Sequence, residues 1–155
     1  MLFEQYAPAT AELLGQARLD ALAELPATCR IGKVCLVHAS PGNLWRAPMP
    51  SASDDDLVRT YRGLGSAAVV YGHVHRPFVR NLGELTVANA GSVGIPWDGD
   101  PRASYLFIDD GEPELIRVEH DIEAEVKALQ ASGYPDSARI AAMLRSGRFT
   151  PVGGT

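Results

Sequence analysis

The chain has 155 residues, a length typical of one domain, and its hydrophobic fraction of 46% and charged fraction of 21% are ordinary for a globular protein. The net charge is −5 and the sequence has no run of lysine or arginine, which argues against a general nucleic-acid binder. No stretch approaches the eighteen or so apolar residues of a membrane span, and the N-terminus does not resemble a signal peptide. We therefore expect a cytoplasmic protein that binds neither nucleic acid nor a membrane.

The first segment with a regular pattern predicts a helix. Leucines and alanines recur at helical spacing after Thr10, and Pro26 lies just beyond the last of them. We expect one continuous helix over residues 10–25.

A β-hairpin is expected next. Two short β-like runs meet at Gly32-Lys33, which predicts a two-residue turn and pairs Cys29 with Leu36. In this register Cys29 and Cys35 point to opposite faces of the sheet, because side chains alternate along a strand. We therefore expect two buried free thiols, as in a reducing compartment.

Ser53 and Asp56 have the spacing of a helix capping box, and predict a short helix from residue 54. The acidic residues Asp54, Asp55 and Asp56 would then lie in the first turn, where the helix dipole favours negative charge. We interpret them as capping residues rather than metal ligands.

The rest of the chain alternates between β-like and helical segments. The β-like runs are residues 67–71, 77–83, 84–90, 103–109 and 113–120, and the helical segments are residues 122–132 and 134–147. This order predicts a mixed α/β or α+β domain with flanking helices. We expect a main domain over residues 1–130, and a C-terminal helix and loose tail over residues 131–155.

Three histidines follow two of the apolar strands. His73 and His75 come just after residues 67–71, and in an extended segment both imidazoles would point to one face while Val74 points into the core. His38 ends the second strand of the hairpin, and strand ends are where α/β sheets present ligand-binding groups. Imidazole is the commonest side-chain ligand of transition metals, so we predict that His38, His73 and His75 bind metal. For His38 alone, the alternative is an ordinary buried histidine.

The histidines belong to a longer resemblance. The segment "LVHASP", followed by "VVYGHVHRPFVRNLGELTVANAGSVGIPWDGDPRASYLFID", resembles the C-terminal half of calcineurin-like metallophosphoesterases, and among them the small YfcE-like phosphodiesterases. The shared features are a lone histidine after a strand, Gly-His-x-His, an Asn-x-Gly-Ser loop and Gly-Asp-Pro-Arg, in that order. The resemblance covers about residues 10–127 and implies an αββα sandwich around two divalent ions of manganese, iron, zinc or nickel.

Roles for single residues follow from this resemblance. It implies that His38 and His73 bind one ion, that His75 binds the other, and that a metal-bound hydroxide hydrolyses a phosphomonoester or phosphodiester. No protein nucleophile is needed, so no catalytic side chain is predicted. The Asn-x-Gly-Ser loop implies that Asn89 and Ser92 border the substrate, although its glycines are equally typical of a tight turn.

Two arginines and two tryptophans are further candidates for a substrate pocket. Arg76 and Arg102 have the planar guanidinium that suits a phosphate, although surface ion pairs are equally consistent with them. Trp45 and Trp97 lie in expected loops, and we interpret both as buried hydrophobic plugs.

The chain also departs from the family pattern. The motifs Asp-x-His, Gly-Asp and Gly-Asn-His-Asp, which supply the family's carboxylate and amide ligands, have no counterpart before His38, and Gly42-Asn43 is followed by Leu44. Three neutral imidazoles cannot hold two divalent ions, so we expect one ion or none in this chain alone. We expect a chain that lacks the N-terminal half of the domain.

An incomplete domain of this kind should expose apolar surface. We therefore expect a homo-oligomer, or an association with the missing N-terminal half. Two alternatives to a phosphoesterase remain open, namely a non-catalytic scaffold on the same fold and a mononuclear three-histidine metal-binding module.

Overall fold

The structure, a computed structural model, describes residues 2–151, with side chains from Tyr6 onward. The helices are α1 (Leu2–Leu14), α2 (Gln16–Ala23), α3 (Asp54–Tyr61), α4 (Ile122–Ala131) and α5 (Ser137–Ser146), with a 3-10 turn at Arg62–Leu64. The strands are β1 (Thr28–Ile31), β2 (Val34–Val37), β3 (Ala68–Tyr71), β4 (Phe78–Asn81), β5 (Thr86–Asn89), β6 (Ala103–Asp109) and β7 (Glu112–Val118).

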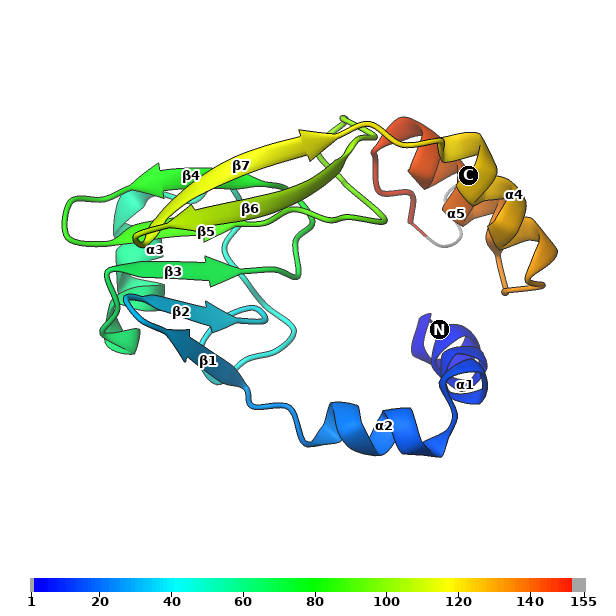
Figure 1. The fold of residues 1–155 in the computed structure, drawn as a ribbon, viewed down its shortest axis with the longest axis horizontal. Coiled ribbons are helices and arrows are strands. Elements are labelled where there is room, and N and C mark those ends of the chain that lie inside the picture. The colour runs from blue at the N-terminus through cyan, green and yellow to red at the C-terminus, as the bar shows by residue number, and fades with distance from the viewer. Residues whose placement is uncertain (1, 152–155) are drawn as a thin grey trace.

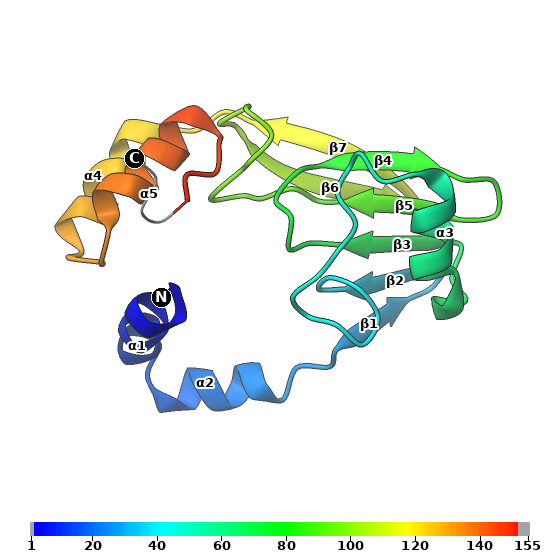
Figure 2. The same ribbon diagram turned by 180° about the vertical axis from the view of Figure 1, so that it is seen from behind.

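A mixed five-stranded sheet forms the centre of the molecule, in the order β1-β2-β3-β5-β4. Strands β2, β3 and β5 are parallel, and β1 and β4 are antiparallel to their neighbours. Helix α3 covers one face of this sheet, and the β6–β7 hairpin crosses the other face (Figures 1 and 2). The expected α/β architecture with a mixed sheet and flanking helices is confirmed.

The hairpin β1–β2 has the predicted turn and the predicted register, in which Cys29 pairs with Leu36. Both cysteines are free, and Cys35 is buried as expected. Cys29 is exposed, so the prediction of two buried thiols is wrong. The reason is the position of β1 at the edge of the sheet, where all four of its residues are exposed.

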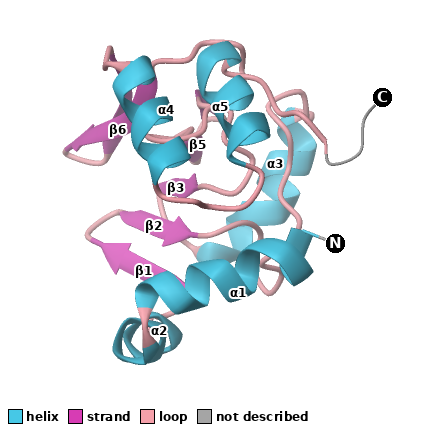
Figure 3. Ribbon diagram, turned by 90° about the vertical axis from the view of Figure 1, so that its right-hand side faces the viewer, coloured by secondary structure: helices cyan, strands magenta, loops and turns pink. Residues whose placement is uncertain are grey.

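The N-terminal helix is not continuous. Gly15 has φ 73°, in the left-handed region, and separates α1 from α2. A residue without a Cβ adopts this conformation at little cost, so Gly15 ends the first helix where leucine and alanine periodicity alone predicted continuation. The two helices run in different directions (Figure 3). Helix α1 reaches the C-terminal part of the chain through Tyr6, whose hydroxyl donates to Asp136 Oδ2 at 2.6 Å.

The N-cap that the sequence predicts at the start of α3 is confirmed. Ser53 is the N-cap, and its Oγ accepts a hydrogen bond from the Asp56 backbone N–H at 3.2 Å. The Ser53 hydroxyl donates to Asp56 Oδ2 at 2.7 Å, and this bond is the largest cause that lowers the pKa of the Asp56 carboxyl.

Two buried tyrosines fix the loop that joins β2 to α3. The rings of Tyr61 and Tyr71 stack with centroids 5.1 Å apart, between α3 and the sheet. The Tyr61 hydroxyl donates to the carbonyl of Ala39 at 2.9 Å, and the Tyr71 hydroxyl donates to that of Pro48 at 2.6 Å. Both ends of the loop are thereby attached to the core.

Helices α4 and α5 pack together through Val126, Ala141 and Leu144. The chain then turns back at Gly147, whose carbonyl accepts from the Gly99 N–H at 2.8 Å. The described part of the expected loose tail is therefore attached to the rest of the molecule, while residues 152–155 lie outside the described residues. Within residues 2–151 no helix has both the length and the apolar character that crossing a bilayer requires.

Replacing Tyr61 by phenylalanine tests the attachment of the loop. The Ala39 carbonyl is fully buried, since Ala39 has 0% exposure, and Tyr61→Phe leaves this acceptor without its donor. We expect a loss of about 1–2 kcal/mol in the free energy of unfolding, measured by urea denaturation. Tyr105→Phe, at a residue that is 44% exposed, should change this free energy by less than about 0.5 kcal/mol. Equal effects of the two substitutions would contradict the assignment.

Candidate metal centre

The candidate centre lies at the carboxyl edge of the three parallel strands. His38 follows β2, the segment 72–76 follows β3, and the segment 90–98 follows β5. Because the parallel strands end side by side, the three segments meet there. The Gly72 N–H donates to the His38 carbonyl at 3.0 Å and so joins the first two segments.

The segment from His73 to His75 is not extended, so the expected strand-like geometry is wrong. His73 has φ 62° and His75 has φ 52°, both in the left-handed region. Such a conformation costs a non-glycine residue about 1–3 kcal/mol and persists where the surroundings hold it. Val74 is buried in the core as expected, which fixes the middle of this segment. The two imidazoles consequently take part in separate clusters.

His38 and His73 form the first cluster. His38 Nε2 and His73 Nδ1 lie 3.2 Å apart, and the ring centroids are 5.1 Å apart in an edge-on arrangement. His73 Nε2 lies 3.1 Å from the Trp45 carbonyl, which can only accept, so this nitrogen carries the proton in the neutral ring. His73 Nδ1 then accepts from His38 Nε2.

The separation of these two nitrogens fits one shared metal ion. Two nitrogens at 2.0–2.1 Å from a zinc-like ion lie about 3–3.4 Å apart at ordinary coordination angles. An ion between His38 and His73 would replace the proton that the two nitrogens share in the metal-free protein.

His75 forms the second cluster. Its Nδ1 donates to the Ile95 carbonyl at 2.8 Å, and its ring stacks on that of Trp97 with centroids 4.3 Å apart. A ring held in this way presents Nε2, and histidines that bind metals usually donate their other nitrogen to a carbonyl or carboxylate. The ring of His75 is therefore oriented as that of a metal ligand would be, but it does not contact the pair formed by His38 and His73.

The described residues do not complete a metal site. Within residues 2–151 no group of three or more histidine, cysteine, aspartate or glutamate side chains has a geometry that could hold an ion. The three histidines predicted as ligands thus divide into a pair and a single residue. The nitrogens of His38 and His73 fit part of the coordination shell of one ion. The remaining positions of that shell would need water or side chains other than those of residues 2–151.

The residues of the Asn-x-Gly-Ser loop hold the strand ends together. Asn89 is fully buried, its Nδ2 donates to the Gly72 carbonyl at 2.6 Å, and its Oδ1 accepts from the Gly91 N–H at 2.9 Å. Ser92 Oγ accepts from the Ile95 N–H at 2.9 Å. Gly91 has φ 72°, and a Cβ at this position would lie 2.0 Å from Ser104 Oγ.

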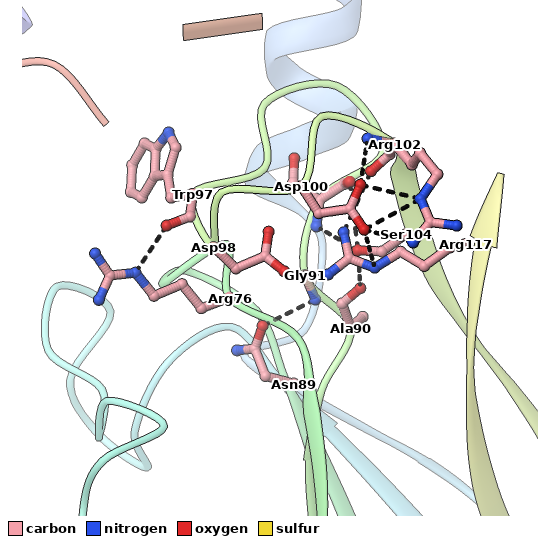
Figure 4. A network of polar contacts seen from close by, with 11 residues as sticks. Arg76, Asn89, Ala90, Gly91, Trp97, Asp98, Asp100, Arg102, Ser104 and Arg117 are labelled. Atoms are coloured by element: carbon pink, nitrogen blue, oxygen red, sulfur yellow. Dashed lines mark hydrogen bonds and ion pairs between the residues drawn. The ribbon is translucent and has the colours of Figure 1, made fainter. Parts of the chain in front are cut away.

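The two predicted arginines have different surroundings (Figure 4). Arg102 is bound to Asp100, with its Nη2 2.6 Å from Oδ2, and Asp100 also lies 3.9 Å from Arg117 Nε. The hydrogen bonds from Arg102 are the largest cause that lowers the pKa of Asp100. Arg76 donates through Nε to the Trp97 carbonyl at 3.0 Å, and its terminal nitrogens point away from this polar network.

The two tryptophans are not both buried hydrophobic side chains. Trp45 is 66% exposed, so its interpretation as a buried plug is wrong, because the loop after β2 carries it beyond the core. Trp97 is half-buried, and its backbone N–H donates to the His75 carbonyl at 2.9 Å. Together with the bonds from His75 and Arg76, this contact joins the segment after β3 to the segment after β5.

Comparison with known proteins shows the superfamily of the chain. Residues 14–111 match the sequence profile of the "Calcineurin-like phosphoesterase superfamily domain". The chain belongs to the calcineurin-like phosphoesterase superfamily.

Three proteins similar to this phosphoesterase-superfamily chain come from two archaea and a bacterium. An uncharacterized protein of Methanocaldococcus jannaschii is 32% identical over 123 residues, covering 67% of this chain and 48% of that protein. A protein of Methanothermobacter thermautotrophicus named "Probable metallophosphoesterase" is 40% identical over 57 residues, covering 35% of this chain and 33% of that protein. The crystal structure of a metallophosphoesterase from Sphaerobacter thermophilus gives a TM-score of 0.73 at 25% identity, covering 88% of this chain and 63% of the solved one. The match spans about half of the first relative's length.

The electrostatic surroundings of His38 and His75 favour the neutral imidazole, which is the form that binds metal. Partial burial is the main cause that lowers the pKa of His38, and the neighbouring charge of His73 adds to it. Burial also lowers the pKa of His75, although its bond to the Ile95 carbonyl acts in the opposite direction.

The lowered pKa values predict a pH dependence of stability. In the unfolded chain His38 and His75 have a pKa near 6.5, above their values in the folded protein. As the pH falls below about 6.5, the unfolded chain therefore binds protons first, and the free energy of unfolding of the metal-free protein should decrease. Urea denaturation at pH 7.5, 6.5 and 5.5 measures this decrease.

Variants assign the effect to one residue. His75→Gln should make the decrease smaller, whereas His120→Gln, at an exposed histidine, should leave it unchanged. A free energy of unfolding that stays constant or rises from pH 7.5 to 5.5 would contradict the expected protonation of His38 and His75.

Proposed function

We propose that this chain is part of a metal-dependent phosphoesterase that hydrolyses phosphomonoesters or phosphodiesters, as in the YfcE-like branch of the superfamily. The observation that carries the proposal is the pair His38 and His73, whose nitrogens lie 3.2 Å apart at the carboxyl edge of the sheet. Strained backbone at His73 and at His75 supports it, since such strain is concentrated at functional sites.

The metal would be a divalent ion of manganese, iron, zinc or nickel. His38 and His73 would hold one ion through Nε2 and Nδ1, and His75 would offer Nε2 to a second ion in a complete site. When bound, such ions polarise the phosphoryl group and lower the pKa of a bound water. Burial lowers the pKa of His38 and of His75 and so favours the neutral form that this binding requires, and the Ile95 carbonyl fixes the orientation of the His75 ring.

Arg76 is the predicted substrate residue best suited to contact a phosphate. Its terminal nitrogens form no hydrogen bond or ion pair with residues 2–151, and its bond to Trp97 fixes the side chain. Arg102, Asn89 and Ser92 already use their polar groups within the chain. We propose that these three position the surrounding loops, and that a direct contact to substrate would require them to exchange existing bonds.

A non-catalytic scaffold is the second candidate function. One observation favours it, namely that the histidines of the described residues do not gather into one group of three. A surface suited to a partner is present on the β6–β7 hairpin, where Tyr105, Phe107 and Val118 are exposed on one face. We propose that this face binds a second copy of the chain or a polypeptide that completes the metal site.

Metal content tests the proposed enzyme. We expect the purified chain to bind one Mn²⁺ or Zn²⁺ ion, with an affinity that falls at low pH, measured by equilibrium dialysis and elemental analysis. His73→Gln should weaken this binding at least about tenfold, because it removes one of the two paired nitrogens. His120→Gln is the matched control, since it removes an exposed histidine and should leave binding unchanged.

The same preparation should be assayed with an aryl phosphodiester and added Mn²⁺. Hydrolysis by the wild-type chain that is lost in His73→Gln would support the proposed phosphoesterase function. Metal binding without hydrolysis supports an incomplete site, and an affinity equal in the wild type and His73→Gln would contradict the role of the pair.

Self-association tests the surface on the β6–β7 hairpin. We expect the weight-average mass in sedimentation experiments to rise with protein concentration, because exposed aromatic residues on one sheet face favour burial. Phe107→Ser should move the chain toward the monomer, and Leu22→Ser, at an exposed leucine of α2, should not. A monomer at every concentration would exclude the homo-oligomer.

A further inference from the structure

A pocket of about 500 Å³ opens beside His73, and three aromatic side chains line it. Trp45 comes from the loop after β2, Trp97 from the loop after β5, and Phe149 from the segment after α5. Trp45 is 66% exposed and Phe149 is 44% exposed, so much of their ring surface is accessible. Arg46 adds a positive charge to the same wall. The volume is within the range of sites for small organic ligands.

The aromatic wall is ordered by contacts within the chain. Trp97 lies between the ring of His75, at 4.3 Å, and that of Phe149, at 4.8 Å between centroids. The indole Nε1 of Trp97 is buried and has no hydrogen-bond partner within residues 2–151. Unsatisfied buried donors are rare in folded proteins and call for an explanation.

Phe149 is held in place although it lies near the end of the chain. Arg139 forms an ion pair with Asp136, and its Nη1 donates to the Thr150 carbonyl at 2.6 Å. The residue that follows Phe149 is thereby attached to α5. The pocket wall that Phe149 provides is therefore formed before any ligand binds.

Positive charge lies beside the aromatic wall. Arg76 lines this pocket and also a second one of about 400 Å³, which shares Trp97 and adds Arg148. Asp98 lines the second pocket too, but it is paired with Arg117. A guanidinium with accessible terminal nitrogens binds a phosphate through two parallel hydrogen bonds. The surroundings of Arg76 are thus positive in a chain whose net charge is −5.

We propose that these neighbouring pockets bind a nucleotide, with the base against Trp45 and Phe149 and the phosphate against Arg76. Stacking on aromatic rings recognises any base, because every base has a π-face. Arginine recognises the phosphate, and His73 brings the candidate metal centre to the same wall. The inference rests on the proposed function, since it names the class of phosphoester that the centre would take.

Binding to the metal-free full chain tests this inference separately from hydrolysis. AMP and ribose 5-phosphate carry the same phosphate and ribose, and only AMP carries a base. Both tryptophans of the chain line the pocket, so quenching of intrinsic fluorescence reports binding, and calorimetry gives the stoichiometry. We expect AMP to bind at least about tenfold more tightly than ribose 5-phosphate.

Variants locate the base. Trp45→Ala and Phe149→Ala should each reduce the preference for AMP several-fold, whereas Leu44→Ala, at a residue that is 50% exposed and adjacent to Trp45, should keep it. Arg76→Gln should weaken both ligands. Thermal unfolding checks that each variant is folded.

Equal affinities for AMP and ribose 5-phosphate would overturn the inference, as would a preference for AMP that both aromatic variants retain. A failure of AMP to bind would overturn it too. None of these outcomes depends on metal binding or on phosphodiester hydrolysis. A failure of the nucleotide site is therefore distinguishable from a failure of the phosphoesterase.

Discussion

The stacked pair of Tyr61 and Tyr71 is the interaction on which the candidate centre depends. Each hydroxyl donates to a carbonyl of the loop after β2, at Ala39 and at Pro48. Burial is the main cause that raises the pKa of both phenols, so both remain neutral donors at any physiological pH. His38 directly precedes Ala39, and the core of the protein therefore sets the position of the first imidazole.

The opposite side of the centre depends on bonds between two loops. Asn89 joins the end of β3 to the loop after β5, and His75, Arg76 and Trp97 continue the contact outward. These bonds hold the segment after β3 in place. His73 and His75 can therefore keep their left-handed backbone conformation. The backbone carbonyls of Ile95 and Trp97 thus orient His75 and Arg76, and Asn89 holds together the loops that carry them.

Much of the fold could be predicted from the sequence, because local signals decide it. The turn at Gly32-Lys33 sets the register of β1 and β2, and Ser53 caps α3, as expected. The geometry of the candidate metal centre was less predictable from the sequence than the fold. The spacing of His73 and His75 is typical of a strand, but their left-handed backbone arises from tertiary contacts that a spacing does not encode. Phe149 had no sequence signal at all, since its role depends on the return of the chain after α5.

The close packing at Gly91 has a consequence for experiments that substitute every position of the chain. A Cβ at Gly91 would overlap Ser104 Oγ and lie 2.9 Å from the Pro77 Cβ, so each replacement must displace the loop that carries Trp97. Such a survey would find Gly91 as intolerant of substitution as the histidines of the candidate centre. The cause at Gly91 would be steric, and its variants would lose folded protein without any change in the side chains of the candidate centre.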